Sequence, residues 1–289
     1  MNSVPFVFID DVCHQLKRQT FKQISELSNP WSTFGAEHGK RRREFLFACT
    51  VDGKECCYAI EDRNSRTGML GADLNLKFDR ITMVGFPFMD QVRNQITVDK
   101  LKRDVLPNVS SFVANCNWCY FSSEFSARNR MLFEAFKNCP GFVDICVQEQ
   151  GQESREFVTR QVEIGNVERL NISANQLAEW PEPEKLAETL EIFANSSRFH
   201  CLINHGALPN DTELFELFLE RALAKELKRY ACISLDAITS ANSQVIGSFR
   251  AECRDYSAKE QKAIAWRIPD SSRRIVLTKT WKALLMEVA

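Results

Sequence analysis

Two cysteine motifs are the first places in this sequence to look for chemistry. Residues 116–119, Cys-Asn-Trp-Cys, have the CxxC spacing used by zinc ribbons and by thiol oxidoreductases. A structural zinc site needs four ligands, and no second CxxC or paired histidine lies nearby in the sequence. A redox CxxC opens a helix that lowers the thiol pKa, whereas Trp118 and Tyr120 are typical of a strand. We therefore expect two cysteines of a strand region and no metal site.

The second candidate cluster consists of His200, Cys201 and His205. A strand places His200 and Cys201 on opposite faces, so they are poorly placed to bind one metal ion together. The sequence contains no nucleophile elbow, phosphate loop, dinucleotide fingerprint or His-Glu-x-x-His motif. We therefore expect no catalytic residues, no metal ligands and no cofactor, and a protein that is not an enzyme.

Length and charge limit the classes of partner. The chain has 289 residues, enough for one large domain and a small N-terminal module. The net charge is −1 with 26% charged residues, which gives no overall attraction to nucleic acid or to an anionic membrane. No apolar run approaches the roughly 20 residues that span a bilayer. We expect a soluble protein of the cytoplasm and/or the nucleus that binds neither nucleic acid nor membrane.

The cysteine count points to an intracellular protein with reduced thiols. Eleven cysteines are an odd number, the chain is long, and the N-terminus lacks the basic and apolar regions of a signal peptide. Five of the cysteines lie inside apolar runs typical of strands: Cys49, Cys57, Cys146, Cys201 and Cys232. We expect these five to be core residues, because free cysteine behaves as a small hydrophobic side chain.

The N-terminus has the pattern of two short helices. Ile9, Val12 and Leu16 have the spacing of an apolar stripe on a helix from about residue 5 to residue 16, and Pro5 suits its first turn. Thr20 is an acceptable N-cap for a second helix, which carries apolar residues at positions 21, 24 and 27 and ends before Pro30. Trp31 follows the turn and can fold back over the pair. Residues 35–43 are polar, end in four basic residues, and are predicted to be a linker.

These anchors resemble the F-box, a helical docking module. The F-box pattern has Leu-Pro, then a leucine eleven residues after the proline, an Asp-Leu pair, and a tryptophan ten residues beyond that leucine. Here Val4-Pro5, Leu16, Thr20-Phe21 and Trp31 stand at those offsets without a gap. The opening Met-Asn-Ser-Val-Pro-Phe and the basic run at residues 41–43 are similar in style to the short, divergent F-box families expanded in nematodes.

The resemblance implies the substrate-recruiting subunit of an SCF (cullin) ubiquitin ligase. Such a subunit binds a Skp-type adaptor, and through it the cullin, while the rest of the chain holds an unknown target protein. The implied adaptor-binding residues are Pro5, Ile9, Val12, Leu16, Phe21, Ile24, Leu27 and Trp31. The alternative is a non-catalytic intracellular interaction scaffold with a vestigial F-box, because Thr20 stands where the family has an acidic residue and Leu27-Ser28 replaces a Val-Cys pair.

The remaining chain predicts an α/β body. Asp52-Gly53 between two apolar runs indicates a hairpin, and alternation at residues 74–78 indicates a strand. Short strands at residues 118–120, 143–145, 170–172, 201–203 and 233–235 alternate with helical patterns at residues 186–194 and 215–222, the second with a capping signal at Asn210, and a last strand is expected at residues 275–277.

The expected fold class is therefore α/β, with α+β character at the N-terminus. The strand spacing of 25 to 32 residues favours an irregular leucine-rich-repeat-like βα array, in which each unit buries its apolar face against its neighbours. A single α/β sheet domain with crossover helices is the alternative. The predicted domains are a helical module and linker at residues 1–43 and a substrate-binding body at residues 44–289.

Overall fold

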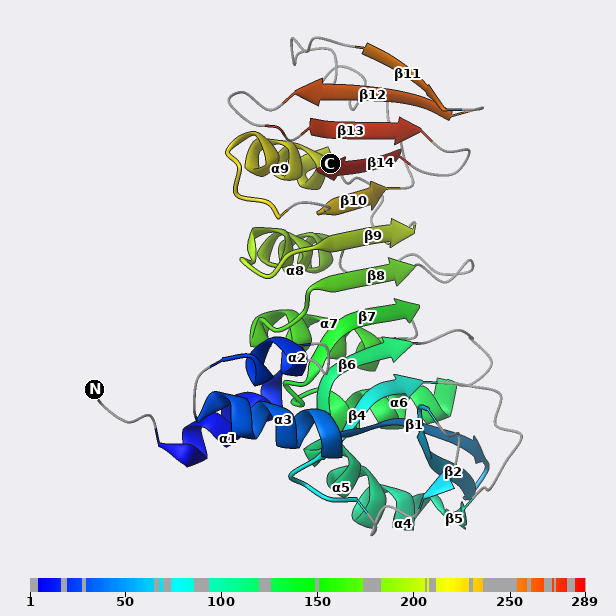
Figure 1. Cartoon of the computed structure of the whole chain (residues 1–289). Helices are drawn as coiled ribbons and strands as arrows, with labels where there is room; N and C mark the ends of the chain where they lie inside the picture. The colour runs from blue at the N-terminus through cyan, green and yellow to red at the C-terminus, as the bar shows by residue number, and fades with distance from the viewer. Residues whose placement is uncertain are drawn as a thin grey trace. The chain divides into compact units, whose positions relative to one another are not determined.

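The chain is an α/β protein, as predicted, with N-terminal helices followed by mixed, mostly parallel strands that alternate with helices (Figure 1). The computed structural model describes residues 5–16, 20–27, 30–64, 68–69, 74–85, 94–119, 126–148, 151–173, 183–205, 207, 212–228, 231–235, 254–258, 261–267, 272, 274–279 and 284–288. The chain divides into two compact units. The first comprises Met1–Tyr120 and Phe125–Val143, and the second comprises Phe121–Glu124 and Asp144–Ala289.

The first unit opens with three helices, α1 (Phe6–Gln15), α2 (Thr20–Ser25) and α3 (Trp31–Arg41). The two expected helices are confirmed, with Thr20 as the first helical residue of α2 and not its N-cap. The linker expected at residues 35–43 is wrong, because α3 extends to Arg41 and the first strand begins at Arg43. Gly35 and His38 are buried on α3, so tertiary packing holds as a helix a segment whose composition is unfavourable for one.

Strands β1 (Arg43–Asp52) and β2 (Glu55–Asp62) form the predicted hairpin. Asp52 pairs with Glu55, and Gly53 adopts a φ of 59°, the left-handed conformation that glycine permits without strain. Four further strands complete this sheet: β3 (Gly68–Met69) and β5 (Asn94–Thr97) pair antiparallel with β2, β4 (Asp79–Gly85) pairs parallel with β1, and β6 (Val113–Cys119) pairs parallel with β4. The hairpin prediction is therefore confirmed.

The strand predicted at residues 74–78 is wrong, because this segment is a turn that leads into β4. The Asn75 side-chain oxygen accepts a hydrogen bond from the Lys77 backbone N–H at 2.9 Å. The Asn75 backbone N–H donates to Asp79 Oδ2 at 2.6 Å. Asparagine and aspartate compete with strand pairing in this way, since their side chains bond to nearby backbone groups.

The rest of the first unit is helical. Helix α4 (Val98–Lys100), a π-helical segment (Leu101–Val105) and α5 (Leu106–Ser111) follow one another, and α6 (Ser126–Phe136) comes after β6. Helix α6 packs on the sheet, with the Phe136 ring 6.3 Å from the ring of Phe47 on β1 and 6.0 Å from that of Phe142. These aromatic side chains form the core of the first unit.

The second unit is built on a regular alternation of strand and helix. The chain enters it within β7 (Phe142–Gln148) and continues through α7 (Gln152–Ile164), β8 (Arg169–Ser173), α8 (Pro183–Asn195), β9 (Cys201–His205), α9 (Thr212–Leu223) and β10 (Cys232–Leu235). The strands β7, β8, β9 and β10 pair in that order and are parallel. Helices α7, α8 and α9 lie on the same face of these strands (Figure 1). The predicted alternation of strands and helices in a βα array is therefore confirmed.

Antiparallel strands extend the array. Strand β14 (Leu284–Val288) pairs with β10 and is followed outward by β13 (Arg274–Lys279), β12 (Gln261–Arg267) and β11 (Arg254–Ala258). The strand predicted at residues 275–277 is confirmed within β13. The capping signal at Asn210 lies outside the described residues.

Candidate functional site

The N-terminal module, defined here as helices α1 to α3, has its own small apolar core. Ile9 and Cys13 lie one turn apart on α1 and Phe21 and Ile24 lie one turn apart on α2, and all four are buried together. Leu16, Trp31 and Phe34 pack against this cluster and are partly exposed. The module therefore fills its interior with side chains of its own.

Helices α2 and α3 cross closely at Gly35. A Cβ atom added at Gly35 would lie 2.6 Å from Ile24 Cγ2, which is closer than van der Waals contact permits. At Gly39, one turn further along α3, an added Cβ would lie 3.3 Å from Phe21 Cβ. The glycines thus let α3 approach α2, and this approach explains why residues 31–41 fold as a helix.

The eight residues predicted to bind an adaptor are divided between the interior and the surface of the module. Ile9, Phe21 and Ile24 are core residues, and Leu16 and Trp31 are partly exposed residues that pack against the core. Val12 is also partly exposed, whereas Pro5 and Leu27 are exposed, Leu27 with 53% of its surface accessible. Five of the eight residues are therefore at least partly accessible to solvent: Pro5, Val12, Leu16, Leu27 and Trp31.

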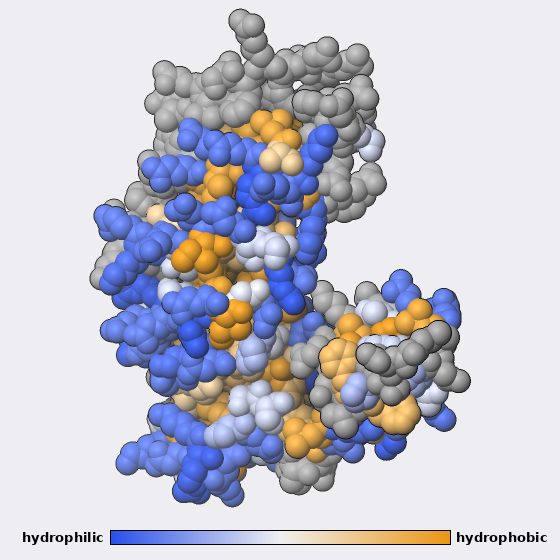
Figure 2. Space-filling model, turned by 90° about the vertical axis from the view of Figure 1, so that its left-hand side faces the viewer, coloured by the Kyte–Doolittle hydropathy of each residue, from blue (hydrophilic) through white to orange (hydrophobic). Residues whose placement is uncertain are grey.

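Helix α1 carries a second apolar face, directed outward, which we call the outer stripe: Pro5, Phe8 and Val12. These residues are spaced i, i+3 and i+7, which places them on one side of a helix. Phe8 is 53% exposed, and the neighbouring Phe6 is 66% exposed, its ring 5.9 Å from that of Phe34. Figure 2 shows hydrophobic surface on this module, at the lower right.

Sequence reasoning missed Phe6 and Phe8. The signal for Phe8 was present, because it lies three residues after Pro5 and four before Val12 on the predicted helix. The family pattern drew attention to Ile9 instead, and Ile9 is fully buried.

Polar groups lie inside the module, on the opposite side from the outer stripe. His38 of α3 is fully buried between the rings of Phe21 and Phe78, and its Nε2 lies 2.8 Å from Asp10 Oδ1. The Nζ atom of Lys77 is 3.5 Å from the same carboxylate oxygen. Burial lowers the pKa of His38, while the hydrogen bond with Asp10 opposes this effect. This network joins α1 and α3 to the turn before β4.

Arg42 joins the module to the sheet. Its guanidinium donates to the carbonyl oxygens of Leu16 at 2.6 Å and Cys13 at 2.8 Å, which lie at the C-terminal end of α1. It also lies 4.7 Å from the centre of the Phe21 ring. Carbonyls in the last turn of a helix have no i+4 partner, and Arg42 supplies donors to two of them, although Cys13 O also accepts from the Leu16 backbone N–H at 3.3 Å. Burial lowers the pKa of Arg42 to about 10, and the side chain remains charged at neutral pH.

The second unit presents an exposed line of polar side chains, which we call the polar row: Asp144, Arg169, Cys201, Cys232 and Glu287. These residues stand opposite one another in register on the adjacent strands β7, β8, β9, β10 and β14. All five are partly or fully exposed, whereas the next residues along β8, β9 and β10 are buried. Since side chains alternate along a strand, the row lies on the sheet face opposite α7, α8 and α9.

The polar row corrects the expectation for the cysteines. Cys49 is buried as predicted, but Cys57, Cys146, Cys201 and Cys232 are partly exposed and are not core residues. For Cys201 and Cys232 the reason is the alternation of the strand, which turns Leu202 and Ile233 toward the helices.

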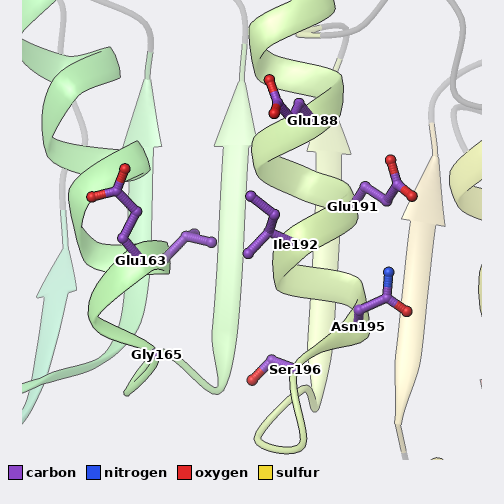
Figure 3. Close-up of a pocket in the computed structure, with 8 residues that line it drawn as sticks. Glu163, Gly165, Glu188, Glu191, Ile192, Asn195 and Ser196 are labelled. Carbon is purple, nitrogen blue, oxygen red and sulfur yellow. The ribbon is translucent and has the colours of Figure 1, made fainter.

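A hollow of about 600 Å³ lies between α7 and α8 (Figure 3). Three carboxylates line it, from Glu163 at the end of α7 and from Glu188 and Glu191 on α8. Ile192 points from α8 toward α7 and is 51% exposed. The hollow therefore combines acidic residues with an apolar lining that includes Val162 and Ile192.

The described residues of the two cysteine motifs lie in β6 and in or just before β9. The CxxC lies within β6, with Cys116 buried, in agreement with the strand expected there. His200 Nε2 lies 3.2 Å from an Arg169 guanidinium nitrogen, just before β9. Within the described ranges, no three residues of the types His, Cys, Asp and Glu are grouped closely enough to hold a metal ion.

Comparison with known protein families, with curated proteins and with solved structures found no match for this chain. No helix among the described residues has the length and apolar character required to cross a membrane.

Proposed function

We propose that this protein is an F-box-type substrate-recruiting subunit of an SCF (cullin) ubiquitin ligase. The N-terminal module binds a Skp-type adaptor, and the remainder of the chain holds a target protein. The protein catalyses no reaction itself and acts in the cytoplasm or the nucleus. Its effect is to raise the effective concentration of a target lysine near the ubiquitin carrier, as tethering does for any pair of linked partners.

The observation that carries this proposal is the apolar surface left exposed by a module whose core is already complete. Among the described residues, five large hydrophobic side chains are exposed, and three of them belong to the first 27 residues: Phe6, Phe8 and Leu27. Burying a side chain of this size contributes about 1.5–3 kcal/mol, so together they supply a substantial part of a binding free energy. Phe8 is the large exposed side chain of the outer stripe, and an exposed apolar stripe on a helix is suited to binding a partner protein.

The geometry of α1 fits recognition of a helix in a groove. Such recognition uses apolar anchors spaced i, i+3, i+4 and i+7 on one helix face, and the outer stripe supplies i, i+3 and i+7. The inner face of α1, through Ile9 and Cys13, packs in the module's core with residues of α2 and α3. The helix can therefore bind an adaptor without giving up its own packing.

The second unit offers two surfaces for a target protein. The polar row presents charged and polar side chains on the face of β7 to β10 that α7, α8 and α9 leave uncovered. The hollow between α7 and α8 presents three carboxylates around Ile192. Both surfaces differ in character from the apolar outer stripe, which is consistent with two different partners.

A second candidate function is an interaction scaffold whose F-box is vestigial. The observation that favours it is the connection between the module and the sheet. Arg42 donates two hydrogen bonds to the end of α1, and Asp10 on α1 interacts with His38 and with Lys77, which lies in the turn before β4. A module tied to the sheet in this way also contributes to folding, whether or not it binds an adaptor.

The two functions are separated by co-purification of the full-length chain with a Skp-type adaptor. Phe8→Asp changes an exposed residue of the outer stripe, so the variant should fold normally and lose the adaptor. Ile192→Asp is the matched control, because Ile192 is 51% exposed against 53% for Phe8 and lies outside the module. Capture by the wild type and the Ile192 variant, but not by the Phe8 variant, supports the ligase subunit. Absence of capture by a folded wild type would favour the scaffold.

A further inference from the structure

Two thiols face each other in the polar row. Cys201 on β9 and Cys232 on β10 are directly opposite in the parallel register, and their Sγ atoms lie 3.1 Å apart within hydrogen-bonding distance. Both side chains are partly exposed, so a small solute can reach them. Their separation in sequence is 31 residues, and the pairing depends entirely on the fold.

The backbone already has the dimensions that a disulfide needs. Neighbouring strands lie about 4.7–4.9 Å apart, and disulfides join residues whose Cα atoms are about 4.4–6.8 Å apart. Bond formation requires the sulfurs to approach from 3.1 Å to about 2.05 Å. Rotation of the two side chains supplies this movement, so β9 and β10 can keep their register.

The surroundings make one thiol the better nucleophile. The hydrogen bond between the sulfurs lowers the pKa of Cys232 and raises that of Cys201, while burial raises the pKa of both. Arg169, opposite Cys201 on β8, also lowers the pKa of both thiols, and Glu287 and Asp144 act in the opposite direction on Cys232 and Cys201 respectively. Cys232 is therefore the residue that attacks first.

We propose that Cys201 and Cys232 form a thiol–disulfide exchange site for a low-molecular-weight disulfide such as oxidised glutathione. The Cys232 thiolate attacks one glutathione sulfur, breaks the glutathione disulfide and releases one glutathione, which takes up a proton. Cys201 then loses its proton and attacks the Cys232 sulfur, which releases the second glutathione and forms the Cys201–Cys232 disulfide. Two electrons and two protons pass from the protein thiols to give two molecules of reduced glutathione.

Two other cysteine sites in the same chain provide internal comparisons. Cys49 and Cys56 also interact through their side chains, but both are buried and cannot be reached by glutathione. Cys146 is partly exposed like the proposed pair, yet the residue in register with it on β8 is Asn171. The combination of a facing thiol and exposure is what distinguishes Cys201 and Cys232 from these residues.

The test uses the full-length protein in mixtures of reduced and oxidised glutathione, followed by alkylation, trypsin and mass spectrometry. Cleavage after Arg198 and Arg221 isolates Cys201, and cleavage after Arg229 and Arg250 isolates Cys232, so each peptide contains one cysteine. We expect both thiols to be lost together and a cross-linked peptide pair to form, and reduction should restore both thiols. Cys146→Ser should leave the cross-link unchanged.

Two variants identify the order of attack. Cys201→Ser should stop the reaction at a stable glutathione adduct on Cys232, whereas Cys232→Ser should lose the cross-link and show little adduct on Cys201. The proposal is overturned if wild-type Cys201 and Cys232 remain reduced under conditions that modify the partly exposed Cys57. It is also overturned if wild-type Cys232 keeps its glutathione adduct without forming the cross-link.

Discussion

The N-terminal module and the βα array of the second unit distribute polar and apolar groups in opposite ways. The module buries His38, packs against the buried Arg42 that follows it, and exposes Phe6 and Phe8. The array buries its apolar side chains between helices and sheet and exposes the polar row. The module is therefore specified by a few directional contacts, whereas the array is specified by repeated hydrophobic burial. The two regions should respond differently to mutation and to pH.

The largest expected effect is the loss of Arg42. Arg42→Ala removes two charge-assisted hydrogen bonds to the end of α1, each worth about 1.5–3 kcal/mol. We expect the free energy of unfolding of the first unit to fall by about 3 kcal/mol, as measured by urea denaturation. Hydrogen exchange should show the loss of protection in α1 and α2.

Arg41→Ala is the matched control for Arg42. Arg41 is exposed, forms an i, i+4 pair with Glu37 at 3.0 Å and lies over the Phe78 ring. An exposed pair and an exposed cation–π contact contribute about 1 kcal/mol or less. Equal losses for the two variants would show that Arg42 does not hold the module to the sheet.

A smaller effect is expected at the crossing of α2 and α3. Gly35→Ala places a methyl group 2.6 Å from Ile24 Cγ2, and overpacking of this kind costs about 1–3 kcal/mol. Gly39→Ala, where the nearest atom is 3.3 Å away, should cost less. The combination of Gly35→Ala with Ile24→Leu removes the Cγ2 methyl group that is in conflict, because leucine is not branched at Cβ, and should recover part of the stability in the same denaturation experiment. Failure of the second substitution to help would indicate a different arrangement of the two helices.

The smallest effect is a pH dependence that belongs to the module. Burial holds the pKa of His38 below its ordinary value of about 6.5, although Asp10 opposes the shift and Arg42 and Lys77 add to it. The unfolded chain then binds more protons than the folded chain in the window below about pH 6.5. The stability due to this group is therefore present above that window and is lost as the pH falls through it.

This pH effect is measured by thermal unfolding between about pH 7.5 and about pH 5. The melting temperature of the wild type should fall over this range, because the free energy of unfolding decreases by about 1 kcal/mol or less. His38→Gln has no titrating group at this position and should show a flatter profile. An identical slope for the two proteins would mean that other groups account for the pH dependence.

The sequence predicted the array better than the module, and the reason is physical. The strands at residues 143–145, 170–172, 201–203 and 233–235 follow a pattern of burial that repeats along the chain. Such a pattern can be recognised in the order of apolar and polar residues. Helix α3 was missed because its glycines and polar residues disfavour a helix in isolation, and only the approach to α2 compensates. The turn at Asn75 was missed because its side chain bonds to backbone that the hydrophobic pattern does not describe.

The candidate sites divide in the same way. The family pattern singled out the segment that forms α1, yet it could not distinguish Ile9, which is buried, from Phe8, which is exposed, because that difference depends on how α1 packs with the other two helices. The pairing of Cys201 with Cys232 could not be predicted, since it requires the register of β9 against β10. The sequence pattern along a single helix or strand predicted its structure, whereas the contacts between different elements could not be predicted from such a pattern.

The most direct test of the central claim is calorimetric titration of the full-length protein with a purified Skp-type adaptor. We predict that the wild type binds and that Phe8→Ala raises the dissociation constant by about tenfold or more. This change corresponds to a loss of about 1.4 kcal/mol of binding free energy for an anchor residue. Ile192→Ala should leave the dissociation constant within about twofold of the wild type. Binding that is equally strong for the wild type and the Phe8 variant would contradict a role for the outer stripe, and no binding by the folded wild type would contradict the proposed function.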